Sequence, residues 1–185
     1  KKKIFRDKMI KWFFMPLVAA FLFTGCNNKI NNPKLVVFIS IDQGMPELLD
    51  KYDHLFTGGY RWLKDIGNSF VNTHHDYGYL VTGPGHQVLS SGRYPSSGGV
   101  IGNYWFNRDI KKSWYCVEDT IAHDVVNGGS GRSYRNVEVT ALGDWLKQSN
   151  PKSKVVSISG KDRTAILLGG KNPDMALWYK NHGGW

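Results

Sequence analysis

The stretch that decides the fold is residues 81–86, which read VTGPGH. It follows an apolar and aromatic approach, and residues 86–91 can continue from it as a short helix. Threonine is favoured at a helix start, and proline is tolerated in the first turn because no amide partner is lost there. A helix N-terminus offers free N–H groups and a positive dipole end, which together suit a phosphate. Thr82 is therefore either a nucleophile beside an anion site or a helix cap, and the local sequence leaves both readings open.

Upstream of this stretch, residues 34–41 (KLVVFISI) form a continuous apolar, β-branched run that ends in Asp42. Such a run predicts a strand buried on both faces of a parallel sheet. In open α/β sheets, ligands bind just beyond the carboxyl ends of the strands. The Asp42 carboxylate is thus placed to hold a metal ion, or else it is a turn or cap residue.

Downstream, two further segments carry groups that suit a phosphoryl ligand. The glycine-dense loop at 92–105 allows close approach of the backbone and offers the side-chain amide of Asn103. Residues 154–159 (KVVSIS) predict a second buried strand, which runs into Lys161 and Arg163. Two cations at a strand's carboxyl end form a clamp for phosphoryl oxygens, with arginine able to bind two of them at once. A solvated charge cluster is the alternative for this pair.

The remaining patterns alternate between helix and strand, so we expect an α/β protein with a mostly parallel sheet flanked by helices. In the helix expected at 137–149, the side chains of Val137, Leu142, Trp145 and Leu146 should point inward. The expected elements are helices at 46–55, 60–66, 82–91 and 137–149, a strand at 69–73, a strand and turn within 175–185, and a hairpin at 106–117 turning near 108–109.

Length and charge limit the function classes. With 185 residues the chain is long enough for one domain with a real core. The net charge is +9, but the first 25 residues hold six of the 24 Lys and Arg and one of the 15 acidic residues. The rest is only mildly basic and shows no basic run with interleaved aromatics, so we expect no nucleic-acid partner.

The N-terminus has the plan of a secretory signal, with a basic region, an apolar run at 12–23 and small residues before Cys26. It resembles a bacterial lipoprotein signal, which implies lipidation at Cys26; an ordinary signal peptide or short anchor is the alternative. We therefore expect a signal peptide at 1–25, a tether at 26–33 and a globular segment at 34–185. Cys116 would remain unpaired as a buried strand residue, and the adjacent His74 and His75 are interpreted as structural because neighbouring side chains of an extended segment point apart.

Taken in order, Asp42, the Thr-Gly-Pro-Gly-His stretch at 82–86, Asn103 and the Lys-Asp-Arg run at 161–163 resemble the alkaline phosphatase superfamily. The likeness is to bacterial phosphatases with a threonine nucleophile, which are related to type I phosphodiesterases and nucleotide pyrophosphatases. It covers residues 33 to about 179, and it implies an alkaline-phosphatase-like fold.

This resemblance also implies a site with two zinc ions. Asp42 would bind one zinc, and Thr82 would be the second ligand of that zinc and the nucleophile that becomes phosphorylated. Asn103, with the Gly83 amide beside it, would donate to a phosphoryl oxygen. Lys161 and Arg163 would contact the remaining oxygens, and in this family that pair accompanies phosphate monoesters. Zinc can deprotonate the hydroxyl, and donors around the phosphoryl group stabilise its charge.

Two features depart from the family pattern. This chain has Gly98 where the family commonly has a histidine. The family's other zinc ligands come from sequence well beyond the Lys-Asp-Arg run, and two ligands cannot fill a site that wants four. We therefore expect these 185 residues to be an N-terminal part of the catalytic domain, inactive alone.

The functional expectation is a zinc-dependent phosphate monoester hydrolase that acts on a phosphorylated small molecule. A phosphodiesterase or nucleotide pyrophosphatase, and a non-enzymatic lipoprotein that keeps the scaffold, are the alternatives. We expect a monomer on the periplasmic side of a bacterial cell envelope, either lipid-anchored to the membrane or secreted.

Overall fold

The computed structural model describes residues 33–123 and 130–180. The structure divides into two units, Lys1–Ile39 and Ser40–Trp185. The predicted signal peptide, Cys26 and nearly all of the predicted tether lie outside the described residues. Within the part of the chain that the structure describes, no helix has the length and apolar character needed to cross a membrane.

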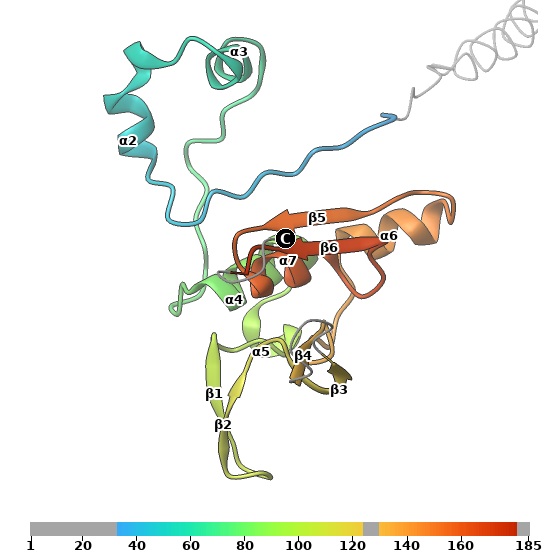
Figure 1. The fold of residues 1–185 in the computed structure, drawn as a ribbon. Coiled ribbons are helices and arrows are strands. Elements are labelled where there is room, and N and C mark those ends of the chain that lie inside the picture. The colour runs from blue at the N-terminus through green and yellow to red at the C-terminus, as the bar shows by residue number, and fades with distance from the viewer. Residues whose placement is uncertain (1–32, 124–129, 181–185) are drawn as a thin grey trace, which may run out of the picture. The chain divides into compact units, whose positions relative to one another are not determined.

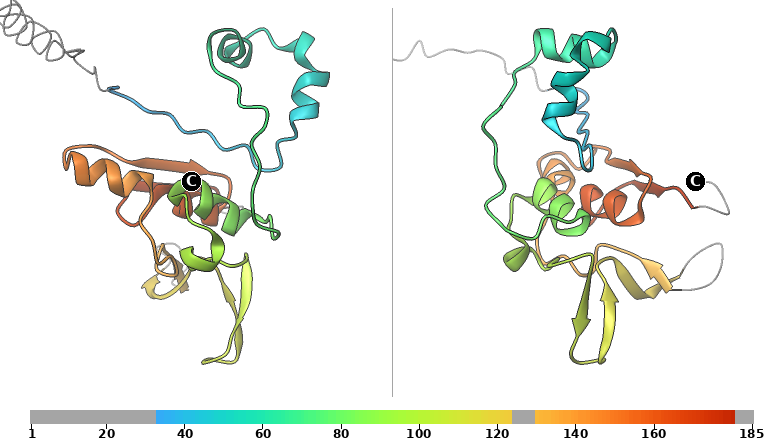
Figure 2. Two further views of the ribbon diagram at one scale, coloured as in Figure 1. Left: turned by 180° about the vertical axis from the view of Figure 1, so that it is seen from behind. Right: turned by 90° about the vertical axis from the view of Figure 1, so that its left-hand side faces the viewer.

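Two helices form the centre of the second unit. Helix α4 (Thr82–Ser91) and helix α7 (Asp162–Gly169) lie side by side in Figures 1 and 2. The Ser90 hydroxyl of α4 donates a hydrogen bond to the Leu167 carbonyl of α7 at 2.8 Å. Because Ser90 and Leu167 are both buried, this bond satisfies polar groups that would otherwise be costly to remove from water.

A parallel strand pair packs on α7. Strands β5 (Val156–Ser159) and β6 (Met175–Trp178) run parallel in the register Val156↔Met175. The chain enters β6 through Asp174, whose carboxylate accepts the Val155 N–H at 2.8 Å. The same carboxylate pairs with Lys147 and Lys154. This cluster ties helix α6 (Leu142–Ser149) to the start of both strands.

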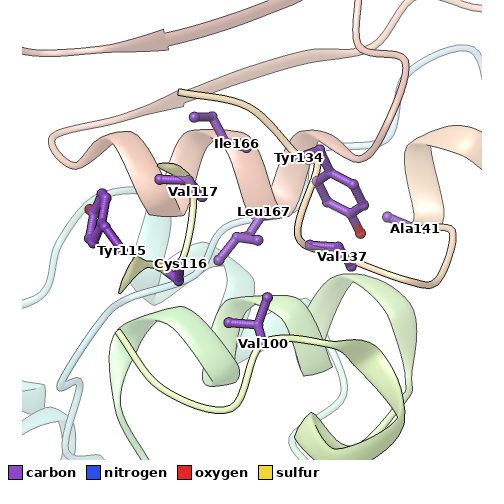
Figure 3. Close-up of a cluster of buried hydrophobic side chains, with 9 residues drawn as sticks. All are labelled: Val100, Tyr115, Cys116, Val117, Tyr134, Val137, Ala141, Ile166 and Leu167. Carbon is purple, nitrogen blue, oxygen red and sulfur yellow. The ribbon is translucent and has the colours of Figure 1, made fainter. Parts of the chain in front are cut away.

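The hydrophobic core lies between α7, the loop before α6 and the segment that follows strand β2 (Figure 3). Leu167 of α7 and Val117 are fully buried in it. Cys116 is free and also fully buried, as expected from the sequence. It lies in the turn between β2 and β3 and not in a strand, so that part of the prediction is wrong. The core residues are Val100, Tyr115, Cys116, Val117, Tyr134, Val137, Ala141, Ile166 and Leu167.

Two antiparallel strand pairs extend from this core. The predicted hairpin is present as β1 (Tyr104–Asn107) and β2 (Lys112–Tyr115), with turn residues at 108–111. A second pair joins β3 (Glu118–His123) to β4 (Ser130–Arg132) and has a register irregularity. Neither β3 nor β4 was predicted from the sequence.

The remaining helices are short. Helix α5 (Pro95–Gly98) contacts α4. Helix α2 (Pro46–Lys51), the 3-10 helix η1 (Asp53–Leu55) and helix α3 (Gly59–Ile66) match the expected helices at 46–55 and 60–66. Asp53 links η1 to α3 through ion pairs with Arg61 and Lys64 at 2.8 and 2.6 Å.

Several sequence-based predictions are wrong in detail. Residues 34–41 and 69–73 are not strands, and their apolar side chains are exposed, with Leu35 at 78% and Val71 at 92%. Within the described residues no strand pairs with either segment. An extended segment becomes a strand only when a neighbour accepts hydrogen bonds from its N–H groups and donates to its C=O groups. The described sheets are three pairs, of which β5–β6 is the parallel one.

The predicted helix at 137–149 begins five residues late. The Asp144 carboxylate accepts the Ala141 N–H at 2.8 Å and thereby fixes the helix start at Leu142. Val137 is buried as predicted, although it precedes the helix. Leu142, Trp145 and Leu146 remain 42–48% exposed, so their predicted inward placement is wrong.

Candidate functional site

The Asp42 carboxylate is the meeting point of the predicted site residues. The Thr82 hydroxyl donates a hydrogen bond to Asp42 Oδ2 at 3.3 Å. The Lys161 ammonium donates to the same oxygen at 2.6 Å. The three residues come from the turn at 42–43, the start of α4 and the residue before α7. The fold thus brings the side chains of Asp42, Thr82 and Lys161 together, although the sequence places them at the ends of separate segments.

The pairing with Lys161 stabilises the charged form of Asp42. The hydrogen-bonded ammonium holds the pKa of the Asp42 carboxyl below its usual value, and the nearby Thr82 hydroxyl acts in the same direction. Asp42 therefore stays ionised at neutral pH and can accept a cation. Both side chains of the ion pair are partly exposed, so the pair itself adds little to stability.

Thr82 is free for this contact because it does not cap its helix. Val81 is the N-cap residue of α4 and no side chain makes a capping hydrogen bond, so the interpretation of Thr82 as a cap is wrong. Its hydroxyl points to Asp42 instead.

His86 connects the start of α4 to the segment before Asp42. His86 Nδ1 lies 2.7 Å from the Thr82 carbonyl oxygen, which can only accept, so this nitrogen carries the proton. His86 Nε2 is then an acceptor for the Ser40 hydroxyl at 3.2 Å. This bridge, in which His86 is buried and Ser40 is partly exposed, holds the chain two residues before Asp42 against α4.

Gly83 and Asn103 form a second contact at the site. The Gly83 N–H donates to Asn103 Oδ1 at 2.7 Å. This bond assigns the oxygen of the amide to Gly83 and leaves the NH₂ end of Asn103 to face elsewhere. The Gly83 amide, expected from the resemblance to bind a phosphoryl oxygen, is engaged by Asn103 in this structure. A Cβ at residue 83 would lie 3.0 Å from Asn103 Oδ1, so the glycine permits the close approach.

Arg163 lies in the first turn of α7 and is half-buried. Its Nη1 donates to the Tyr115 hydroxyl at 3.0 Å, and that hydroxyl donates to Asp162 Oδ1 at 2.5 Å. Sequence reasoning missed Tyr115 and Asp162 as parts of the site. The signal that was available is the position of Asp162 between two cations.

The two oxygens of Asp42 and Thr82 fit part of a zinc shell. Carboxylate oxygen binds zinc directly, and a hydroxyl oxygen that already contacts the carboxylate lies in the region that the ion would share. Within residues 33–123 and 130–180, no cluster of three or more His, Cys, Asp or Glu could hold a metal ion. The described residues therefore fit as two ligands of a four-ligand site. His74 is hydrogen-bonded to Asn72, in line with its structural interpretation.

Comparison with known proteins assigns the family. A family model described as type I phosphodiesterase / nucleotide pyrophosphatase matches residues 36–182. The chain belongs to this family. The match takes in every site residue named above, from Asp42 to Arg163.

Several relatives of this phosphodiesterase family are alkaline phosphatases by name. The chain is 37% identical over 153 residues to alkaline phosphatase PhoK of Sphingomonas sp, covering 79% of this chain and 27% of PhoK. It is 36% identical over 175 residues to alkaline phosphatase PafA of Elizabethkingia meningoseptica, covering 91% of this chain and 32% of PafA. The chain thus spans less than a third of the length of these relatives.

Solved structures show the same fold. The crystal structure of wild-type PafA matches with a TM-score of 0.71 and 34% identity, over 75% of this chain and 28% of PafA. A PafA variant with one threonine, one asparagine, one lysine and one arginine substituted matches with a TM-score of 0.75 and 32% identity, over 78% and 29% of the two chains. The predicted α/β, alkaline-phosphatase-like fold is confirmed.

Proposed function

We propose that this chain carries the nucleophile and the phosphoryl-binding residues of a phosphate monoester hydrolase. The observation that carries the proposal is the shared contact of Thr82 and Lys161 with one oxygen of Asp42. A hydroxyl next to an ionised carboxylate and a cation can attack a phosphoryl group whose negative charge the cation neutralises. The attack forms a bond from Thr82 Oγ1 to phosphorus and breaks the bond to the leaving-group oxygen, and the hydroxyl proton of Thr82 ends on the released alcohol. The resulting phosphothreonine is then hydrolysed by water.

We propose Asp42 and Thr82 as two ligands of a zinc ion. A bound zinc lowers the pKa of a coordinated hydroxyl and stabilises negative charge on oxygen. The remaining ligands, and a second zinc, would require residues outside those that the structure describes. Asp42 is suited to this role because its carboxyl is ionised at neutral pH.

The other residues bind the transferred group. Asn103 would donate its NH₂ to one phosphoryl oxygen, since its Oδ1 already accepts from Gly83. Lys161 and Arg163 would contact the remaining oxygens, where a dianionic monoester carries more charge than a diester. The PafA variant with threonine, asparagine, lysine and arginine substituted has the same residue types, in the same chain order, as Thr82, Asn103, Lys161 and Arg163.

The proposal is tested by hydrolysis of an aryl phosphate monoester, with the protein expressed from its complete reading frame and supplied with zinc. We expect Thr82→Ala to remove turnover to the background rate. Thr120→Ala, on the exposed face of β3, is the matched control and should retain activity. After a denaturing quench with radiolabelled substrate, label should remain on the wild type and be absent from Thr82→Ala. Full turnover by Thr82→Ala would refute the assignment of the nucleophile.

A phosphodiesterase or nucleotide pyrophosphatase is the second candidate, because the matching family model carries that description. Comparing kcat/KM for an aryl monoester and its methyl diester distinguishes the two functions. We expect the monoester to be preferred, and Lys161→Ala and Arg163→Ala to reduce that preference. A diester preference in the wild type would favour the second candidate.

We also propose that Cys26 is lipidated and anchors the protein to a membrane on the periplasmic side of the cell envelope. The support is the basic, apolar and small-residue order of residues 1–26. Metabolic labelling with a fatty-acid analogue should label the wild type and leave Cys26→Ser unlabelled.

A further inference from the structure

The guanidinium of Arg163 is oriented by residues to which the proposed function gives no role. Arg163 Nη1 donates to the Tyr115 hydroxyl at 3.0 Å, and Tyr115 donates to Asp162 Oδ1 at 2.5 Å. A phenol has one proton to donate, and in Tyr115 it is used in the hydrogen bond to Asp162. The Tyr115 oxygen therefore accepts the hydrogen bond from Arg163. Arg163 Nε is buried and has no hydrogen-bond partner within the described residues. The bond to Tyr115 therefore fixes the rotation of the guanidinium.

Tyr115 is a rigid support for this bond. It is the last residue of β2, it is 7% exposed, and its ring belongs to the hydrophobic core. The ring of Tyr104 lies 4.8 Å from it, centre to centre. Burial raises the pKa of the Tyr115 phenol, so the hydroxyl stays protonated and can donate to Asp162 across the neutral range.

Asp162 is in turn held from two other directions. Arg132 Nε donates to Asp162 Oδ2 at 3.2 Å, and the backbone N–H of Arg163 donates to Oδ1 at 2.7 Å. The Arg132 guanidinium also lies 5.1 Å from the centre of the Tyr115 ring, within range of a cation–π contact. Both oxygens of the Asp162 carboxylate are thus held in place. The Tyr115 hydroxyl therefore donates its hydrogen bond in one fixed direction.

We propose that Tyr115 and Asp162 are positioning residues that hold Arg163 in the orientation needed to bind the dianionic end of a phosphate monoester. The inference rests on the proposed function, in which Arg163 contacts the transferred phosphoryl group. Arginine binds two phosphoryl oxygens only when its planar fork faces them. A guanidinium free to rotate loses that geometry although its charge remains.

The test is Tyr115→Phe, which removes the hydroxyl and keeps the ring in the core. For the protein expressed from its complete reading frame, we expect kcat/KM for an aryl monoester to fall roughly ten- to a hundredfold, the size of effect that a misplaced binding group produces. The methyl diester carries one charge fewer, so its kcat/KM should fall less than about threefold. Inhibition by inorganic phosphate should weaken in parallel with the monoester rate.

Tyr134→Phe is the matched control. Tyr134 is also 7% exposed and belongs to the same hydrophobic core. Tyr134→Phe measures the general cost of removing a buried hydroxyl from this core. It should leave the ratio of kcat/KM for the monoester to kcat/KM for the diester unchanged. Asp162→Asn is a second probe in case Tyr115→Phe folds poorly, and it should lower the same ratio.

A double-mutant cycle with Arg163→Ala separates the positioning role of Tyr115 and Asp162 from the phosphoryl-binding role of Arg163. Tyr115→Phe should have almost no further effect once Arg163 is alanine. If Arg163→Ala lowers monoester hydrolysis but Tyr115→Phe and Asp162→Asn do not, the positioning role is refuted and the proposed function stands. Equal losses on monoester and diester also refute it. If Arg163→Ala leaves monoester hydrolysis unchanged, the role of Arg163 in the proposed function fails, and the positioning role fails with it.

Discussion

Gly98 offers a sharp test of the packing behind the candidate site. A Cβ at residue 98 would overlap the side-chain amide of Gln87, meeting its carbon, oxygen and nitrogen. Gln87 is fully buried in α4, one residue after His86. Its Nε2 donates to Ser91 Oγ at 2.6 Å and to the Arg93 carbonyl at 3.1 Å. The Gln87 amide therefore occupies the space that any larger side chain at residue 98 would need.

Gly98→Ala should consequently be costly for a change of one methyl group. Forcing an extra carbon into a packed core costs about 1–3 kcal/mol. Displacing the Gln87 amide also breaks bonds worth about 1 kcal/mol each and leaves buried polar atoms unpaired. Both effects together predict a loss of about 3–5 kcal/mol in the free energy of unfolding. Gly160→Ala is the control, since a Cβ there meets nothing within 4 Å.

The assay is a double-mutant cycle with Gln87→Ala, followed by urea unfolding of all four proteins. Truncation of Gln87 opens the space, so Gly98→Ala in that background should cost less than about 1 kcal/mol, and the coupling should be at least about 1.5 kcal/mol. Additive effects of the two substitutions would refute the reasoning.

Three more predictions follow from the contacts. Lys161→Met should tighten zinc binding roughly tenfold in a chelator competition at neutral pH, because the ammonium no longer competes for Asp42 Oδ2 at 2.6 Å. Leu167→Ala should lower the free energy of unfolding by about 2–5 kcal/mol, because this fully buried side chain leaves a cavity. Asp119 has its pKa lowered from 3.8 to about 2, mainly by the Ser133 hydroxyl, so its stabilising contribution is complete above about pH 4 and is lost as pH falls towards 2. Asp119→Ala should therefore cost stability at neutral pH and cost little near pH 2.

Each of these predictions has a control on the same protein. Lys152→Met changes an exposed lysine elsewhere and should leave zinc affinity unchanged. Leu89→Ala removes a side chain that is 45% exposed on α4 and should cost less than half as much as Leu167→Ala. Asp109→Ala, in the exposed turn after β1, should cost little stability. A pH-independent loss for Asp119→Ala would contradict the assigned cause.

The local elements were predictable because their signals lie within a few residues. The hairpin around 108–111 and helix α3, which ends at Gly67, required no distant partner. The segments at 34–41 and 69–73 have strand-like composition as well, but strand formation depends on a neighbour that the sequence pattern cannot supply. Strand β4 was missed for the opposite reason, because Ser130–Arg132 contains no apolar residue and is defined by its pairing with β3.

The candidate site was also predictable only in part from the sequence. The residue types and chain order identified Asp42, Thr82, Asn103, Lys161 and Arg163 as members of one site, and the structure joins three of them at Asp42. Their partners could not be predicted, because a buried tyrosine such as Tyr115 has the same sequence pattern as any core residue. Its role depends on a hydrogen bond to a residue 47 positions away.

The contact between Lys161 and Asp42 also bears on how the site changes when it is filled. Lys161 was expected to face the phosphoryl group, yet in this structure its ammonium lies on the carboxylate that would bind zinc. A cation binding at Asp42 Oδ2 must displace the ammonium, which would then be free to contact a phosphoryl group attacked by Thr82. Metal binding and phosphate binding should therefore be positively coupled through Lys161. Inorganic phosphate should tighten zinc binding in the wild type, and this coupling should be lost in Lys161→Met; equal coupling in both proteins would show that Lys161 plays no part in it.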